Sequence, residues 1–229
     1  MSNQRIVKRI VLRVAKLARQ SQKKMNKVLL PIFANEQKNL TIEPPYKIMT
    51  PSKIYIGDDV QIGPNCFLYI KENFHEPNAP EAFQRERKQI FNPILTIGNR
   101  VRSRSGLQIA VMNKVDIGDD VIISANVFIS DGTHGYENAM EPYRYQTMTN
   151  IKPVHIKNGC WIGQNAVIMP GVVIGENSIV GANSVVTKNV PPRSIVAGVP
   201  AKIIKRWDDS SEKWKKVNNI AEDKFQSTG

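Results

Sequence analysis

Aliphatic residues recur at every sixth position over much of this chain. The longest run lies near the C-terminus and consists of Ile156, Ile162, Ile168, Ile174, Val180 and Val186. Two earlier runs show the same spacing, one at Ile56, Ile62 and Leu68 and one at Val111, Ile117, Ile123 and Ile129. A period of six is neither the 3.6 of a helix nor a simple alternation of two, so the pattern indicates neither an amphipathic helix nor a flat sheet.

The six-residue period predicts a coil with short flat sides, one hexad to each side. The aliphatic residue of each hexad points inward, and the glycine that often follows it fits a tight corner where a Cβ would crowd the turn. Asp-Asp, Pro-Asn, Ala-Asn and Glu-Asn pairs between the hexads supply turn chemistry. Three hexads per turn give a triangular prism whose coils stack as parallel strands, because one coil alone cannot bury its apolar edge.

Two polar segments interrupt the period and are predicted to be loops that leave the prism. They span residues 71–93 and 135–152, and the second begins directly after His134. Loops carried by a rigid scaffold often hold functional residues. The second loop is therefore the better candidate for part of an active site.

Both ends of the chain are predicted to be helical extensions of the prism. Residues 1–40 are a basic amphipathic extension, in which apolar residues at helical spacing alternate with Lys and Arg. This helix either caps the open end of the prism, the interpretation we favour, or lies on an anionic membrane surface through residues 1–30. The prism itself is assigned to residues 41–206, and residues 207–229 are predicted to form a C-terminal helix and tail.

Composition narrows the function classes. The 229 residues are 41% hydrophobic and 23% charged, which is typical of a soluble globular protein. Nine of the twelve net positive charges lie in residues 1–30, and no nucleic-acid reader accompanies them, so no nucleic-acid partner is expected. The two cysteines, Cys66 and Cys160, provide neither a disulfide framework nor a zinc cluster. We expect a cytoplasmic protein, located at the inner face of the membrane if the basic helix binds lipid.

Three stretches of the chain resemble the hexapeptide-repeat acyltransferases. They are IGDDVQIGPNCF (56–67), IGDDVIISANVFIS (117–130) and residues 156–207, which include AGVPAK (197–202). The last stretch is similar to the closing segment of maltose and galactoside acetyltransferases and of surface-polysaccharide O-acetyltransferases. The resemblance implies a mainly β protein with a left-handed parallel β-helix, a homotrimer, and acetyl-CoA as co-substrate with no metal.

The resemblance also implies that His134 is the catalytic residue. Its context, SDGTHGY (130–136), is similar to that of the family's catalytic histidine. An imidazole has the proton affinity that a general base needs near neutral pH. His75 and His155 are expected to be incidental. Cys66 and Cys160 occupy the fifth hexad place, where a small inward residue is required, so we expect direct transfer without an acyl-enzyme intermediate.

Residues for the two substrates are carried over from the same resemblance. The predicted acetyl-CoA site comprises Trp161, Gly163, Ala182, Thr187, Lys188, Lys202 and Lys205. The predicted acceptor site comprises Asp131, Tyr136 and Asn113, with Asn113 in the stretch RSGLQIAVMNKV (104–115). That stretch has no aspartate, although the galactoside-acetylating relatives use one there. We therefore expect a different carbohydrate acceptor.

The predicted function is transfer of an acetyl group from acetyl-CoA to a hydroxyl of a sugar or surface-polysaccharide precursor. One alternative within the enzyme class is acetylation of an antibiotic or another xenobiotic. Another is a β-helix scaffold without catalytic activity. A γ-type carbonic anhydrase shares the prism but needs three histidines on neighbouring coils to bind zinc, and the spacing of the three histidines here does not favour that.

Overall fold

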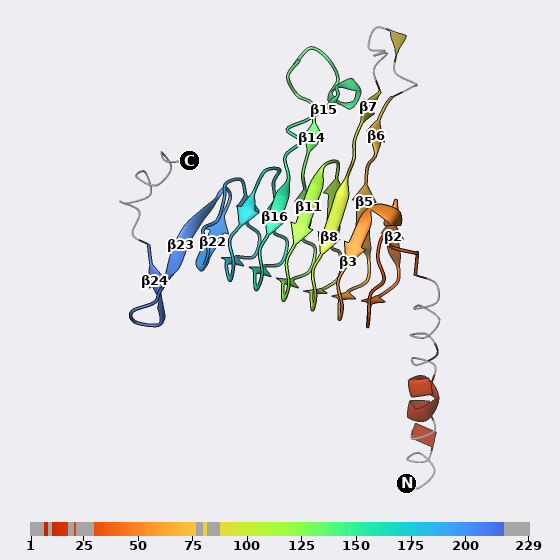
Figure 1. The fold of residues 1–229 in the computed structure, drawn as a ribbon, viewed down its shortest axis with the longest axis vertical. Coiled ribbons are helices and arrows are strands. Elements are labelled where there is room, and N and C mark those ends of the chain that lie inside the picture. Colours follow the sequence, from red (N-terminus) through yellow and green to blue (C-terminus); the bar gives the residue numbers. More distant parts are fainter. Residues whose placement is uncertain are drawn as a thin grey trace.

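A stack of triangular coils forms the body of the molecule in this computed structural model (Figure 1). The structure describes residues 7–8, 11–17, 21, 30–76, 80–81 and 88–217. From Thr41 to Ile174, each coil places one short strand in each of three sheets, and all neighbouring strands within these coils are parallel. The predicted triangular prism is therefore confirmed.

The strands group by sheet. The first sheet contains β1 (Thr41–Ile42), β4 (Gln61–Ile62), β9 (Arg102–Ser103), β12 (Ile122–Ile123), β17 (Trp161–Ile162), β20 (Ile179–Val180), β22 (Ser194–Gly198), β23 (Ala201–Asp208) and β24 (Lys213–Lys216). The second contains β2 (Tyr46–Ile48), β5 (Cys66–Ile70), β10 (Gln108–Val111), β13 (Phe128–Ser130), β18 (Val167–Ile168) and β21 (Val185–Val186). The third contains β3 (Ile54–Ile56), β8 (Ile94–Ile97), β11 (Lys114–Ile117), β16 (Val154–Ile156) and β19 (Val173–Ile174). Two 3-10 turns, η1 (Pro51–Lys53) and η3 (Tyr143–Tyr145), lie outside the strands.

The hexad residues form the core of the prism. All the aliphatic residues at the six-residue spacing are buried, with exposed fractions of 2% or less. The fifth places of the hexads are buried as well, and in the last run they are Cys160, Ala166, Val172, Ser178, Ser184 and Val190. Each fifth-place residue lies two positions before the aliphatic residue of the next hexad. Both face inward because successive side chains of an extended chain alternate between two faces.

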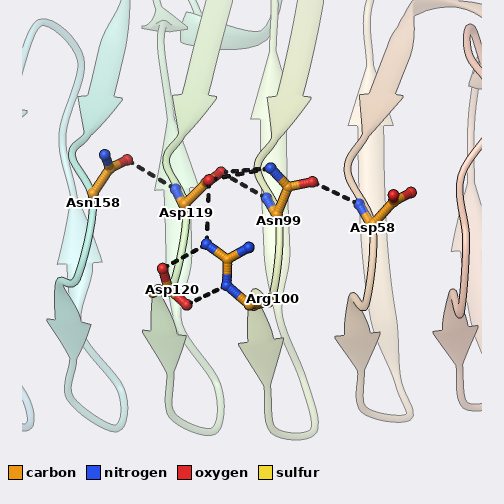
Figure 2. Close-up of polar contacts among 6 residues, drawn as sticks. All are labelled: Asp58, Asn99, Arg100, Asp119, Asp120 and Asn158. Carbon is orange, nitrogen blue, oxygen red and sulfur yellow. Dashed lines mark hydrogen bonds and ion pairs between the residues drawn. The ribbon is translucent and has the colours of Figure 1, made fainter.

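A ladder of Asn and Asp side chains runs along the corner between the third and first sheets (Figure 2). The backbone N–H of Asp58 donates to Asn99 Oδ1 at 2.9 Å, that of Asn99 donates to Asp119 Oδ1 at 2.8 Å, and that of Asp119 donates to Asn158 Oδ1 at 2.9 Å. Each side chain therefore caps the corner of the coil before it. The hydrogen bond from the Asn99 backbone is the main cause that lowers the pKa of Asp119.

Glycine precedes the ladder residue in three of these coils because the side-chain oxygen of the next coil occupies the place where a Cβ would lie. A Cβ on Gly57, Gly98 or Gly118 would lie 2.7, 2.5 or 2.3 Å from the ladder oxygen of the next coil. No Cβ is tolerated at such distances. The Gly-Asp and Gly-Asn dipeptides of the sequence are thus explained by close stacking of the coils as well as by turn chemistry.

The C-terminal helix predicted for residues 207–229 is wrong over its described part. Strands β22, β23 and β24 form an antiparallel extension of the first sheet, and Trp207 pairs with Trp214 at a ring-centroid distance of 5.5 Å. The last coil leaves an open sheet edge beside β22, and a strand that folds back can satisfy the hydrogen-bonding groups of that edge. Residues 218–229 lie outside the described residues.

At the N-terminus, residues 7–8, 11–17 and 21 are helical. The apolar side chains of Val7, Val11, Val14 and Leu17 are about 60% exposed, so this part of the helix does not cap the prism. Phe33 and Leu40 are instead buried in the core, and the prism therefore begins about ten residues before the predicted boundary. Among the described residues, no helix has both the length and the apolar character needed to cross a membrane.

Candidate active site

Both predicted loops leave the prism at the same corner, between the second and third sheets. The first arm, residues 71–93, follows β5, and its strands β6 (Asn73–Phe74) and β7 (Gln89–Ile90) pair antiparallel. The second arm, residues 131–152, follows β13, and its strands β14 (Thr133–His134) and β15 (Met148–Thr149) do the same. The two arms rise side by side, yellow and green in Figure 1. We call this edge of the prism the arm corner.

A tight turn of the intervening coil lies between the bases of the arms. This turn joins β10 to β11 through Met112 and Asn113. A small apolar cluster fills the space above it and contains Phe74, Met112 and Met148, with Phe91 and Ile151 against them. The two arms therefore share one buried base, although Gln89 of the first and Met148 of the second are 59 positions apart in the sequence.

Asp131 holds this turn in place. Its carboxylate has no exposed surface and accepts hydrogen bonds from the backbone N–H groups of Met112 at 2.8 Å and Asn113 at 2.7 Å. Burial raises the pKa of Asp131, and the backbone hydrogen bonds partly oppose that rise. The carboxylate is enclosed and already bonded, so Asp131 supports this turn, and its contact with the acceptor stays a prediction. Its oxygens also do not orient His134.

Replacement of Asp131 by Ala should lower the free energy of unfolding by about 2–4 kcal/mol, because two backbone N–H groups at the arm corner lose their acceptor. Urea unfolding followed by circular dichroism measures this change. Asp120→Asn is the matched control, since it removes the charge of an exposed carboxylate that pairs with Arg100 and keeps a residue type that tolerates the positive φ of 58° at this position, so it should change the midpoint little. Equal midpoints for the two variants would contradict the assigned role of Asp131.

His134 lies at the end of β14, at the base of the second arm, and is exposed. Its ring packs against the edge of Phe74 from the first arm, with 5.6 Å between ring centroids and an interplanar angle of 81°. The ammonium of Lys71 lies 4.4 Å from the centre of the same phenyl ring. Among the described residues, no hydrogen bond reaches the imidazole, so both ring nitrogens are available to substrates.

Two of the predicted acceptor residues lie at the arm corner with His134. Asn113 is exposed in the turn between the arms, while its backbone N–H is used by Asp131. Tyr136 follows His134 by two residues and is 65% exposed. The structure thus places three exposed polar side chains, Asn113, His134 and Tyr136, around the base of the arms.

His155 lies elsewhere, on the outer face of the third sheet. Its Nδ1 is 3.0 Å from Asp116 Oδ2, and Lys114 Nζ is 2.9 Å from the same oxygen. Val154 and Ile156 on either side of it are buried, and the side chain of His155 is only partly buried. The carboxylate partner was not predicted, and it gives His155 the orienting contact that His134 lacks. His155 is therefore an informative control for any test of His134.

The residues predicted to bind acetyl-CoA fall into separate groups. Trp161 is 49% exposed on the first sheet and donates from Nε1 to Ser124 Oγ at 3.1 Å. Gly163 and Ala182 follow β17 and β20, at the corner between the first and second sheets. A Cβ on Gly163 would lie 2.6 Å from the Ala182 backbone nitrogen, so this glycine is required for stacking of the coils.

The other predicted cofactor residues lie farther along the chain. Thr187 and Lys188 follow β21 at the arm corner, two coils beyond His134, and Lys202 and Lys205 lie on β23. Within one protomer, the width of the second sheet separates Trp161 and Ala182 from the arm corner. In the His134 coil, the chain crosses that side of the prism through a turn at residues 125–126 and strand β13.

The two thiols are unsuited to covalent catalysis. Cys66 and Cys160 are both buried, and burial raises the pKa of each thiol to about 11. A thiol with so high a pKa provides very little thiolate, which is the nucleophilic form. Among the described residues, no three His, Cys, Asp or Glu side chains lie close enough together to hold a metal ion.

Comparison with known proteins agrees with this fold. A family model described as bacterial transferase hexapeptide (six repeats) matches residues 153–188, and one described as hexapeptide repeat of succinyl-transferase matches residues 104–131. A mutant of the N-acyltransferase AntD from Bacillus cereus, solved with dTDP and coenzyme A, superposes with a TM-score of 0.60. The match covers 84% of this chain and 90% of that chain at 22% identity, so it concerns the fold alone.

Two curated relatives come from Escherichia coli. WbbJ, which is named as a lipopolysaccharide biosynthesis O-acetyl transferase, is 35% identical over 133 residues, which are 54% of this chain and 66% of that protein. Galactoside O-acetyltransferase is 38% identical over 117 residues, which are 49% of this chain and 54% of that protein. The chain thus spans 54% to 66% of the length of these relatives. The chain carries the hexapeptide repeats of these transferases at residues 104–131 and 153–188, and its prism is the left-handed parallel β-helix that the resemblance implied.

Proposed function

We propose that this protein is an O-acetyltransferase that moves the acetyl group of acetyl-CoA to a hydroxyl of a sugar or surface-polysaccharide precursor. The observation that carries the proposal is the arm corner, where an exposed histidine lies among polar side chains at the base of two projecting arms, and its ring nitrogens bond to no other described residue. The names of the two Escherichia coli relatives, both O-acetyltransferases, support the reaction class and a carbohydrate acceptor.

In this mechanism, His134 acts as the general base. Its imidazole removes the proton from the acceptor hydroxyl while the oxygen attacks the thioester carbonyl carbon. The carbon–oxygen bond forms, and the carbonyl electrons move onto its oxygen, which needs a hydrogen-bond donor such as a backbone N–H. The carbonyl then re-forms as the carbon–sulfur bond breaks, and the imidazolium returns its proton to the departing thiolate. The buried, protonated Cys66 and Cys160 support direct transfer rather than an acyl-enzyme.

Asn113 and Tyr136 would bind the acceptor beside His134. Their exposed side chains offer an amide and a phenol to the hydroxyl groups of a sugar. Asp131 has the supporting role of fixing the turn that carries Asn113. The two arms project from the prism beside His134, and such projecting surfaces favour a polymeric or otherwise extended acceptor over a small xenobiotic (Figure 1).

A homotrimer would bring the two substrate regions together. In one protomer, the width of the second sheet separates Trp161 and Ala182 from the arm corner. The acetyl-CoA site is therefore best formed between neighbouring prisms, with the first-sheet side of one protomer facing the arm corner of the next. Sedimentation equilibrium should give the mass of a trimer. Full activity from a monomer at the working concentration would contradict this arrangement.

Release of free thiol from acetyl-CoA tests the proposed reaction. The protein is incubated with acetyl-CoA and a panel of glycans, nucleotide sugars and antibiotics, and acceptors that gain an acetyl group are identified by mass spectrometry. We expect thiol release that depends on a carbohydrate acceptor. Turnover with an antibiotic alone would support the xenobiotic alternative. Absence of both acetyl-CoA binding and turnover would indicate a scaffold and overturn the proposal.

A further inference from the structure

The first arm contacts the second arm through a side chain that the proposed mechanism does not use. We infer that Gln89, on β7 of the first arm, is a positioning residue that holds the His134 hairpin in its catalytic geometry. This inference rests on the proposed role of His134 as the general base. It assigns the first arm a function in catalysis, which the sequence alone does not indicate.

Gln89 bonds to both backbone groups of a single residue on the second arm. Its Nε2 donates to the carbonyl oxygen of Met148 at 3.0 Å, and its Oε1 accepts from the N–H of Met148 at 2.7 Å. Met148 is the β15 residue that lies directly opposite His134 on β14. A primary amide is well suited to this contact, because it presents a donor and an acceptor side by side, as a peptide group does.

This contact completes an otherwise open strand edge. The arm hairpin consists of β14 and β15 alone, and two-stranded hairpins are marginally stable by themselves. One edge of β15 faces β14, and the Met148 backbone groups that bond to Gln89 are on its other edge. The side chain of Gln89 therefore substitutes for one residue of a third strand, and it fixes the strand to which His134 is paired.

Packing supports the same assignment. The side chain of Met148 is 7% exposed and lies in the apolar cluster with Phe74 of the first arm. Phe74 also contacts the His134 ring directly. The first arm thus holds the histidine in two ways, through Phe74 on its side chain and through Gln89 on the backbone of its paired strand. Displacement of a catalytic group by about 1 Å can cost 10²-fold in rate, so this support is sufficient to control turnover.

A second contact between the arms allows a matched control. Arg144 Nη2 lies 3.4 Å from Glu76 Oε2, and the Arg144 side chain is 71% exposed. This ion pair joins the arms nearer their tips and contacts neither β14 nor β15. If simple docking of the arms were sufficient for activity, loss of the Arg144 contact and loss of the Gln89 contact would have similar effects.

Steady-state kinetics at pH 8 test the inference with the full-length protein. We expect Gln89→Ala to lower kcat by about 10- to 100-fold while the KM for acetyl-CoA changes less than about twofold, because the positioning of His134 is lost and the donor site is intact. Gln89→Glu keeps the size of the side chain but, when ionised, cannot donate to Met148, so its kcat should fall similarly. Arg144→Ala should keep the kcat of the wild type.

A spectroscopic readout separates positioning from general loss of structure. The ring resonance of His134, assigned by its loss in His134→Ala, should shift or broaden in Gln89→Ala and remain unchanged in Arg144→Ala. Wild-type kcat in Gln89→Ala and Gln89→Glu, with His134→Ala inactive, would overturn the inference and leave the proposed function intact. An active His134→Ala would instead overturn the proposed base. If Gln89→Ala does not fold, the isosteric Gln89→Glu decides alone, and wild-type kcat there overturns the inference.

Discussion

Replacement of His134 by Ala should lower the rate of acetyl transfer by about 10²- to 10⁴-fold, the usual contribution of a positioned acid–base group. Without the imidazole, the acceptor hydroxyl has no base to remove its proton as it attacks the thioester. Acetyl-CoA affinity should hardly change, because the proposed donor residues lie on other coils and faces. Steady-state kinetics together with calorimetric titration of acetyl-CoA would separate the two effects.

Two further histidine variants make this test specific. His155→Ala removes an imidazole that is oriented by Asp116 at 3.0 Å, the geometry often seen in a catalytic base. His75→Ala removes the third histidine, which lies in the first arm. Both variants should retain most of the wild-type rate. Near-normal turnover by a folded His134→Ala, or a large loss in His155→Ala, would show that the base has been assigned to the wrong residue.

The prism could be predicted from the sequence because each of its sides is encoded locally. One inward aliphatic residue recurs every six positions, so Ile156 or Ile123 can be assigned without knowledge of distant contacts. The coil that contains β8, β9 and β10 lacks a clear pattern of six, since its middle side presents Ser103 to the core where the other coils have an aliphatic residue.

The meeting of the two arms was not predicted, because it depends on how many residues each coil contains. Both loops were recognised by their polarity. The sequence also contained a signal that they leave the prism at the same corner. Each loop follows a hexad that occupies the same side of the prism, ending at Leu68 in one coil and at Ile129 in another. Counting sides along the coil would have placed the loops at one corner. The contact between Gln89 and Met148 joins residues 59 positions apart, and no local pattern encodes it.

The environment of Asp131 and the strands of the C-terminal segment could not be predicted from the sequence for a different reason. Asp131 was carried over to the acceptor site from the resemblance, but inward and outward side chains alternate along the strand that leads to it. Its burial, and its bonds to the turn of the coil before it, follow from the stacking of coils.

The charged and aromatic residues after Trp207 were compatible with a helix or a strand. The open edge of the first sheet decided between them.

Replacement of Gly98 by Ala should be among the most destabilising single changes in the prism. A Cβ at this position would lie 2.5 Å from Asp119 Oδ1, 2.6 Å from the Gly118 carbonyl carbon and 2.7 Å from the Gly118 carbonyl oxygen. Two of these atoms belong to the backbone of the next coil, so the coils must separate. The hydrogen bond from the Asn99 N–H to Asp119, 2.8 Å long, would then be strained or lost (Figure 2). We expect a loss of about 3 kcal/mol in the free energy of unfolding.

Gly132→Ala is the matched control for this prediction. The nearest atom to a Cβ there is the terminal methyl carbon of Met112, at 2.7 Å, followed by other side-chain atoms. A methionine side chain is flexible and can move away, so the cost should be well under that of Gly98→Ala. Urea unfolding of both variants measures the difference. If both variants lose the same free energy of unfolding, tight contact between coil backbones is not the reason that glycine occupies the corner. The hydrogen bonds of the ladder drawn in Figure 2 would then have to tolerate a wider separation of the coils.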